Sequence, residues 1–358
     1  MTRAARALLD LNAIRKNYRL AKKLSGAARA VAVIKSDAYG HGAIPVAKAL
    51  EAEADAFGVA CLEEAIALRD AGISTRILLL EGFFEPSELG IIDWLNLDLV
   101  IHSTHQLQQF LNADLNSPLN IWLKLDTGMH RLGLSTGDFL ESTRLLSSSP
   151  KVNELILMSH FAQADDPGCK RTTDQLQFFN QVTADIPLPT SLANSPAVLA
   201  WPQTHGDWIR PGMMLYGVSP LTQSNANSLR LEPVMTLESE LIAIRTLGKG
   251  EPIGYGTHYH CDRPTLVGVV AIGYGDGYPR HARNGTPVLV RGKRCPLIGR
   301  VSMDMLTIDL TELEAPAIGD LVTLWGKWLP VEEVASWCDS IPYELVTTLT
   351  KRVPRQYS

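Results

Sequence analysis

The stretch of the 358-residue chain that most clearly points to chemistry is 32–42. An apolar run ends at Lys35, and a turn with Tyr39, Gly40 and Gly42 follows. A lysine held in a partly desolvated site can lose its proton and attack a carbonyl carbon. The two glycines allow the backbone to approach a ligand closely. The stretch therefore suggests covalent carbonyl chemistry at Lys35.

Six further polar residues lie at or just beyond the ends of other apolar runs. Taken singly, each has an ordinary explanation. A strand-end lysine is commonly a solvated charge, a lone histidine is commonly structural, and an arginine before Pro-Gly can simply close a turn. They become interesting only if the runs are strands of one sheet. The six are Lys124, Arg131, His160, Asn194, Ser195 and Arg210.

The elements that would position these residues alternate in type through the first two thirds of the chain. Short β-prone runs alternate with helix-length segments such as 62–71 and 172–183, which indicates a parallel sheet with right-handed crossovers. Eight such runs favour a (β/α)8 TIM-like barrel, in which the polar strand ends would meet at the active-site end. An open doubly wound sheet is the alternative, although its Gly-x-Gly-x-x-Gly fingerprint is absent after the first strand. The runs are 31–34, 57–60, 76–80, 99–102, 120–125, 155–159, 190–193 and 208–210.

The last third has a different pattern, in which strand-like runs follow one another with glycine-containing turns between them. This predicts a mostly antiparallel β domain with one helix at 331–338. The polar segment 221–230 is the expected linker, which gives domains at 1–228 and 229–358. The predicted strands are 237–246, 265–272, 287–290, 295–301, 306–310 and 321–325.

Composition limits the classes of partner and compartment. A net charge of −5 argues against a nucleic-acid binder, and the basic stretch 351–355 is interpreted as a solvated tail. The five cysteines lack metal-ligand spacing, so neither a disulfide framework nor a metal site is expected. With no export pattern and no apolar run of membrane-spanning length, we expect a cytoplasmic enzyme that does not bind membranes.

The ordered set of motifs resembles the alanine racemases, which are enzymes of pyridoxal 5'-phosphate (PLP) with a barrel and a C-terminal β domain. The resemblance covers nearly the whole chain and rests on separated segments rather than on one motif. These segments are 35–42, 124–133, 159–162, 194–195, 210–212, 216–217, 254–256, 273–278 and 301–305.

The resemblance implies that Lys35 carries PLP and that Lys35 and Tyr255 are two catalytic bases on opposite faces of the substrate. Lys35 would take the Cα proton from D-alanine and Tyr255 would take it from L-alanine. PLP would serve as the electron sink that makes this proton acidic. An ordinary phenol is protonated near neutrality, so the second base needs a nearby cation. The family assigns that role to Arg131, together with binding of the substrate carboxylate.

The same resemblance implies how the cofactor is held. Arg210 would face the pyridine nitrogen, and because a guanidinium does not readily give up a proton, the nitrogen would stay unprotonated. This should weaken the electron sink and suppress side reactions such as transamination. The lysine that corresponds to Lys124 often carries a carbamyl group in relatives, and this group fixes the arginine that corresponds to Arg131. Pairing of Lys124 with a carboxylate such as Asp126 is the alternative. The implied cofactor-binding residues are Lys35, Tyr39, His160, Ser195, Arg210, Gly212 and Met213.

In the family, two chains share each active site in a head-to-tail homodimer. Tyr255 would then reach the Lys35 of a second copy, and Tyr274, Met303 and Asp304 would narrow the entrance of that site. Met303 would limit the room for the substrate side chain, which favours alanine. One departure stands out. Relatives carry a phosphate-binding tyrosine shortly before the C-terminal Arg-Val-Pro-Arg, where this chain has Lys351.

The predicted function is therefore interconversion of L- and D-alanine, which supplies or consumes D-alanine. A PLP-dependent decarboxylase of the same architecture is one alternative, but it would place an acidic residue where Arg210 stands. A noncatalytic PLP carrier is a second, but such proteins resemble the barrel alone. A broad-specificity racemase is the third alternative. It is disfavoured because the sequence shows neither an export signal nor paired cysteines.

Overall fold

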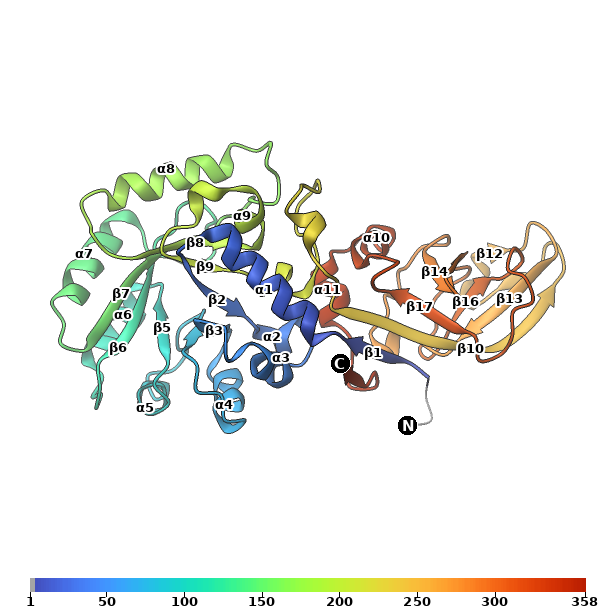
Figure 1. Cartoon of the computed structure of the whole chain (residues 1–358), viewed down its shortest axis with the longest axis horizontal. Coiled ribbons are helices and arrows are strands. Elements are labelled where there is room, and N and C mark those ends of the chain that lie inside the picture. Colours follow the sequence, from blue (N-terminus) through green and yellow to red (C-terminus); the bar gives the residue numbers. More distant parts are fainter. Residues whose placement is uncertain (1–3) are drawn as a thin grey trace. The chain divides into compact units, whose positions relative to one another are not determined.

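The computed structural model describes residues 4–358, which form two compact units (Figure 1). One unit contains 14–38 and 43–231, and the other contains the N-terminal segment up to Ala13 together with 39–42 and 232–358. We call them the barrel unit and the sheet unit. The domain boundary between residues 228 and 229 remains a prediction. That prediction assigned the N-terminal segment and residues 39–42 to the first domain, whereas in the structure they group with the sheet unit.

The barrel unit contains a closed barrel of eight parallel strands, and the first strand pairs with the last. This confirms the predicted TIM-like barrel over the open sheet, and every strand overlaps the run predicted for it. Buried apolar runs of this kind are typical of parallel strands, which are covered on both faces. The strands are β2 (Arg29–Val33), β3 (Ala56–Val59), β4 (Ile77–Leu79), β5 (Asp98–Ile101), β6 (Leu119–Lys124), β7 (Val152–Met158), β8 (Thr190–Asn194) and β9 (Trp208–Arg210).

Helices connect the strands and surround the barrel (Figure 1). Side-chain caps fix several of their starts: Ser103 accepts from the backbone of Gln106, and Ser135 accepts from that of Asp138. The helices are α1 (Leu11–Ser25), α2 (Lys35–Tyr39), α3 (Ala43–Leu50), α4 (Leu62–Asp70), α5 (Glu88–Trp94), α6 (Thr104–Asn112), α7 (Thr136–Ser147), α8 (Arg171–Thr183) and α9 (Ser195–Ala200), with 3-10 turns η1 (Pro202–Thr204), η2 (Met213–Tyr216) and η3 (Ser228–Arg230).

Side chains fill the barrel toward the N-terminal ends of its strands. Trp122 and Trp208 pack edge to face with ring centroids 5.2 Å apart, inside a cluster of buried aliphatic residues. Asp98 accepts hydrogen bonds from Arg76 at 2.5 Å and from the indole N–H of Trp122 at 2.7 Å. This end is therefore closed by packing and buried polar contacts, which leaves the opposite end for a ligand.

The sheet unit is built on an eight-stranded, mostly antiparallel sheet in which the long strand β10 (Met235–Leu247) pairs with three others. The exception to the antiparallel pattern is the parallel pair of β1 and β18. The remaining elements are β1 (Arg6–Leu9), β11 (Pro252–Ile253), β12 (Tyr259–His260), β13 (Thr265–Val270), β14 (Pro287–Val290), β15 (Lys293–Pro296), β16 (Leu306–Asp309), β17 (Leu321–Trp325) and β18 (Arg355–Tyr357), with η4 (Tyr255–Thr257), η5 (Tyr274–Asp276), α10 (Val331–Trp337) and α11 (Pro342–Thr347).

Most strands predicted for this unit, and the helix α10, are confirmed. The predicted strand 295–301 is wrong beyond Pro296, because the left-handed Gly299 (φ 77°) interrupts the extended backbone. Strands β1 and β18 were not predicted. Within 4–358, no helix is long and apolar enough to cross a membrane.

Candidate active site

The C-terminal ends of the barrel strands carry most of the predicted site residues. Lys35 follows β2, Lys124 ends β6, His160 follows β7 and Arg210 ends β9. Ser195 begins α9 directly after β8. Because the strands are parallel and the barrel is closed, these residues meet at one end of the unit.

The backbone after Lys35 makes a left-handed turn. Four consecutive residues, Ser36 to Tyr39, have φ between 52° and 54°, although none of them is glycine. Left-handed backbone costs about 1–2 kcal/mol per residue, so other contacts must hold it. The Glu64 carboxylate accepts from the Ser36 N–H at 2.6 Å, and Asp37 accepts from the first N–H of α3 at 2.8 Å. These contacts fix the direction in which the chain leaves Lys35.

Glu64 is a supporting residue that the sequence did not single out. Its second oxygen accepts from the Ala60 N–H at 2.8 Å, so one carboxylate joins the loops after β2 and β3. The signal available was an acidic residue in the first turn of α4, which is ordinary at a helix start.

Lys124 is buried, and its pKa is lowered to about 8. Burial is the largest cause, the positive charges of Arg210, Arg131 and Lys35 act in the same direction, and Glu81 acts in the opposite direction. Cations therefore dominate the electrostatics around this lysine. Asp126, the alternative partner for Lys124, accepts instead from the backbone of Gly128 and from both the backbone and the ring of His130.

Arg210 is held rigidly by acceptors on β8 and at the residue that follows β7. It donates to the Ser191 hydroxyl and the Ser159 carbonyl, each at 2.6 Å, and to the Leu192 carbonyl at 3.1 Å. Burial lowers the pKa of Arg210 to about 10, so the guanidinium is still charged at neutral pH. One of its N–H groups lies 3.4 Å from Nδ1 of His160.

His160 is a neutral imidazole. Burial lowers its pKa well below the usual value, and the cations at this end, led by Arg210, lower it further. Nε2 lies 3.5 Å from the side-chain nitrogen of Asn194, so each ring nitrogen faces an N–H donor. A doubly protonated ring would place N–H groups against N–H groups on both sides.

A second buried network holds the backbone beside His160. Gln175 on α8 donates to the His160 carbonyl and to the Thr127 hydroxyl, each at 3.0 Å. The Thr127 and Ser159 hydroxyls are 2.7 Å apart. Sequence reasoning missed this network, because a glutamine and two hydroxyls on separate loops form no local motif.

The loops after β8 and β9 form a cradle of N–H groups. Ser195 Oγ accepts from the Gly212 N–H at 2.7 Å and the Met214 N–H at 3.3 Å, which leaves its own hydroxyl hydrogen to donate. Met213 begins the turn η2 at the same place. Phosphate commonly binds in this position of a barrel.

These residues fit PLP. The excess of positive charge around Lys124 calls for an anionic ligand, and the Ser195 cradle supplies the donors that a phosphate requires. Lys35 lies at the same end, as an amine must to bind an aldehyde carbon. The fixed guanidinium of Arg210 can face a ring nitrogen as a hydrogen-bond donor.

Arg131 lies in the barrel unit, in the loop after β6, and its charge acts on Lys124. The other predicted residues are in the sheet unit. Tyr39 belongs to the sheet unit, where its ring centroid lies 5.9 Å from that of Tyr343. Burial raises the pKa of Tyr39, so its hydroxyl remains a hydrogen-bond donor. The other four also lie in the sheet unit: Tyr255, Tyr274, Met303 and Asp304.

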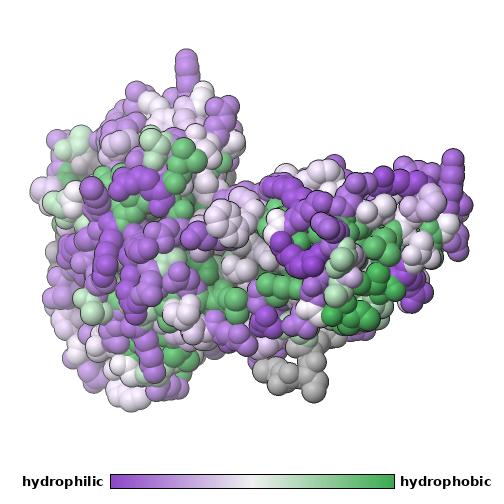
Figure 2. All heavy atoms as spheres, turned by 45° about the vertical axis from the view of Figure 1, so that its right-hand side comes forward, coloured by the Kyte–Doolittle hydropathy of each residue, from purple (hydrophilic) through white to green (hydrophobic). Residues whose placement is uncertain are grey.

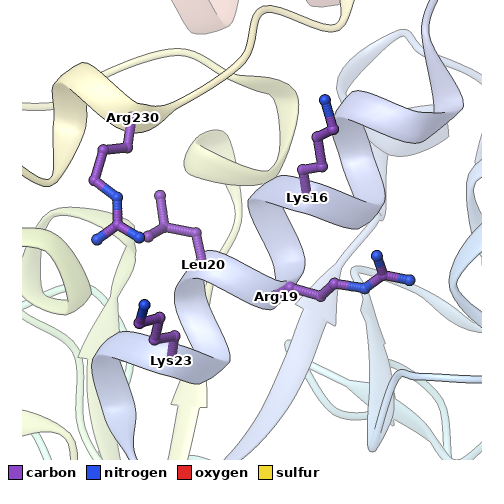
Figure 3. Close-up of a pocket in the computed structure, with 5 residues that line it drawn as sticks. All are labelled: Lys16, Arg19, Leu20, Lys23 and Arg230. Atoms are coloured by element: carbon purple, nitrogen blue, oxygen red, sulfur yellow. The ribbon is translucent and has the colours of Figure 1, made fainter.

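A separate pocket of about 250 Å³ lies on the outer surface of the barrel unit, between α1 and η3 (Figure 3). Arg230 and Lys23 point toward Leu20, whereas Arg19 points away and is paired with Glu53. The pocket is lined from helix α1 and the linker, not from the strand ends. It is therefore not part of the candidate active site.

One class of PLP enzymes combines a closed parallel barrel with a following β sheet. In this class a lysine lies at the end of the first barrel strand, beside a cluster of cations such as the one around Lys124. Two family models divide the chain between them. The model described as "Alanine racemase, N-terminal domain" matches residues 9–220, and the one described as "Alanine racemase, C-terminal domain" matches 234–357. The chain therefore belongs to the alanine racemase family, whose members are PLP-dependent isomerases.

Individual relatives agree with this placement over their full length. The chain is 54% identical to the catabolic alanine racemase of Pseudomonas putida and 55% identical to an alanine racemase of Pseudomonas taetrolens, in both cases over 99% of each chain. The crystal structure of the biosynthetic alanine racemase from Pseudomonas aeruginosa matches with a TM-score of 0.97 at 50% identity, covering 100% of both chains. A Bartonella henselae alanine racemase with covalently bound pyridoxal phosphate matches with a TM-score of 0.91 at 30% identity, covering 99% of both.

Proposed function

We propose that this protein interconverts L- and D-alanine with PLP bound to Lys35. The observation that carries the proposal is the pair of Lys35 and a buried, fixed Arg210 at one end of the barrel. A decarboxylase of this architecture would be expected to carry an acidic group in place of that guanidinium. The family models over both halves of the chain support the same conclusion.

When bound, PLP supplies the electron sink that makes the Cα proton of an amino acid acidic. The Ser195 hydroxyl and the backbone N–H groups at Gly212 and Met213 would hold its phosphate, and Tyr39 would add a phenol. Arg210 would donate to the ring nitrogen without protonating it. His160, neutral and held by Gln175, would lie against the ring.

Racemisation requires proton removal on one face of Cα and delivery on the other. Lys35 would exchange the proton on the face used by D-alanine, and Tyr255 would exchange it on the face used by L-alanine. Arg131 would bind the substrate carboxylate and, as a cation, favour the deprotonated tyrosine. Met303 would limit the side chain to about the size of a methyl group, although a hydroxyl as in serine is hard to exclude.

Lys124 is proposed to be carbamylated. A lysine whose pKa is about 8 has a substantial neutral fraction near pH 7.5, and the neutral amine is the form that reacts with carbon dioxide. The carbamate would place a negative group among Lys35, Arg131 and Arg210. Carbon-13 bicarbonate should give a carbamate NMR signal in the wild type but not in Lys124→Met. A free amine at Lys124 in bicarbonate buffer would refute this.

We further propose a head-to-tail homodimer. The sheet unit exposes several large apolar side chains near its predicted site residues: Tyr255 is 73% exposed, Met303 52%, Met305 42% and Tyr274 37%. Figure 2 shows apolar surface on the part of the molecule that this unit forms. Exposed apolar surface of this kind marks interaction sites, and a second copy would bring Tyr255 to Lys35.

A cytoplasmic location is proposed from the cysteines, since all five are free thiols.

The direct test incubates purified holoenzyme with L-alanine. We expect D-alanine to form, together with an absorbance band characteristic of a lysine-bound cofactor that is absent from Lys35→Ala. Decarboxylation to ethylamine, or a Lys35→Ala variant that keeps both the band and the activity, would overturn the proposal.

A further inference from the structure

The basic stretch near the C-terminus, residues 351–355, is not a solvated tail as the sequence suggested. Val353 is fully buried. Arg355 donates to the Leu349, Thr350 and Val353 carbonyls and to the carbonyl of Gly40, within the sheet unit. The segment is thus fixed on both sides of Arg352, whose position is defined by the fold.

The Arg352 guanidinium joins two separate loops. Its Nε lies 3.1 Å from Oδ1 of Asp276, a fully buried carboxylate in the turn η5. Its Nη2 donates to Oδ1 of Asp304 at 2.5 Å, in the loop between β15 and β16. No predicted role covers Arg352 or Asp276.

Backbone hydrogen bonds bring the same two loops together. The Tyr274 N–H donates to the Ser302 carbonyl at 3.0 Å, and the Gly275 N–H donates to the Met303 carbonyl at 2.8 Å. A Cβ on Gly275 would lie 2.5 Å from Nη1 of Arg352, so this glycine lets the guanidinium lie directly against the turn. Arg352 therefore packs on the backbone between Tyr274 and Met303.

Charge makes this contact more than a surface ion pair. A buried carboxylate is strongly unfavourable without a cation, and removing one partner of such a pair leaves the other uncompensated. The other oxygen of Asp276 accepts from the Gly273 N–H at 2.9 Å and so shapes the start of the turn. Loss of Arg352 would leave the Asp276 charge beside the backbone of Tyr274, where the turn must loosen to admit water.

We propose that Arg352 is a positioning residue that fixes Tyr274 and Met303 and thereby limits which amino acids the enzyme accepts. The inference rests on the proposed function, in which these two side chains narrow the entrance of an active site. Arg352 touches neither substrate nor cofactor and acts through Asp276 and Asp304. The ligand class it selects is the small α-amino acid with a side chain of methyl size.

The test compares Arg352→Gln with Arg352→Lys and with the matched control Arg294→Gln. Arg294 forms a two-bond ion pair with Glu333 in the same unit, but on an exposed surface. We expect Arg352→Gln to raise KM for L-alanine roughly tenfold with little change in kcat, because an ordering contact to a charged group is lost. The preference for alanine over L-2-aminobutyrate should fall on the order of tenfold, about the value of one methylene in a pocket.

Arg352→Lys keeps the charge but cannot span both carboxylates, so it should show an intermediate effect, and Arg294→Gln should match the wild type. Amide hydrogen exchange gives a readout that does not depend on activity: the Tyr274 and Gly275 amides should exchange faster in Arg352→Gln than in the control. If Arg352→Gln does not fold, Asp276→Asn removes the charge of the buried carboxylate that Arg352 contacts and should give the same loss of preference.

Unchanged KM and preference in a folded Arg352→Gln dimer, or a loss of kcat alone, would overturn the inference. Failure of the proposed function is a different result, because the wild type itself would then form no D-alanine.

Discussion

Arg210 is the residue whose chemistry separates racemisation from the other reactions open to this architecture. It donates to the Ser191 hydroxyl and to the Ser159 and Leu192 carbonyls, so its position does not depend on a ligand, and a guanidinium has further N–H groups that could face the cofactor. A glutamate in its place would set a carboxylate against two carbonyl oxygens and would carry a proton that the cofactor ring nitrogen could share.

We expect Arg210→Glu to lower the rate of D-alanine formation on the order of 100-fold and to raise the share of pyruvate, the transamination product. Arg210→Lys is the control, since it keeps a cation and should not raise pyruvate. The ratio of pyruvate to D-alanine, measured on both variants, decides the matter. An unchanged ratio in Arg210→Glu would contradict the role assigned to the guanidinium.

Lys124 should make the stability of the protein depend on pH. Its pKa is about 8 in the folded state and 10.5 when unfolded, so between these values the unfolded state holds more protons. The free energy of unfolding should therefore rise as pH rises from about 8 to 10.5 and lose this contribution as pH falls through 8. The gain is at most about 3 kcal/mol.

Urea unfolding at pH 7.5 and 9.5 in carbonate-free buffer, compared with Lys124→Met, isolates this contribution. Between these pH values the free energy of unfolding should change more in the wild type than in Lys124→Met. This difference in pH dependence should shrink when bicarbonate is added, because a carbamate no longer titrates as an amine. A difference that is the same at both pH values without bicarbonate would show that Lys124 is not the titrating group.

At the scale of elements, the left-handed turn after β2 stores strain beside the reactive lysine. Ser36 is exposed and has φ of 54°, where a Cβ is unfavourable. Ser36→Gly should raise the free energy of unfolding by up to about 1 kcal/mol, since relief of strain outweighs the added freedom of the unfolded chain. Ser36→Val should lower it by about 1–2 kcal/mol.

Ser36→Ala is the matched control, because it keeps the Cβ and should change stability little. Chemical denaturation of the three variants should give the highest free energy of unfolding for Ser36→Gly, a lower one for Ser36→Ala and the lowest for Ser36→Val. A Val variant as stable as the Gly variant would mean that the turn is not left-handed in solution.

The alternation of apolar runs was enough to predict the eight barrel strands, because each strand is buried on both faces and its sequence shows it. The left-handed turn could not be predicted, since Ser36 to Tyr39 contain no glycine and Glu64, which holds the turn, is distant in sequence. Strand β1 was missed because four residues carry little pattern, and its partner β10 lies more than 220 residues away. The support around Arg210 and His160 was hidden for the same reason: its residues meet only in the folded barrel.

At the scale of the whole molecule, the proposed shared site makes activity a property of two chains. Lys35→Ala and Tyr255→Phe should each be inactive alone. In a mixed dimer both changes fall in one site, and the other site is intact. Random mixing of equal amounts should restore about one quarter of wild-type activity, and the isolated mixed dimers should have about one half.

The control mixture combines Lys35→Ala chains with chains that carry both changes, which can form no intact site. Activity is measured after the mixed dimers have been isolated by differential tags. No recovery in isolated mixed dimers would rule out the shared site and leave Tyr255 without the proposed partner.

Strand β1 has a consequence for the order in which the protein matures on the ribosome. It is synthesised before every barrel strand, yet its neighbours in the sheet are β10 and β18, which are synthesised after the whole barrel. The barrel can close once β9 has emerged, while β1 waits with its hydrogen-bonding edges unpaired. The sheet can therefore be completed only after β18 is released, so we expect a ribosome stalled late in translation to hold a closed barrel without a finished sheet.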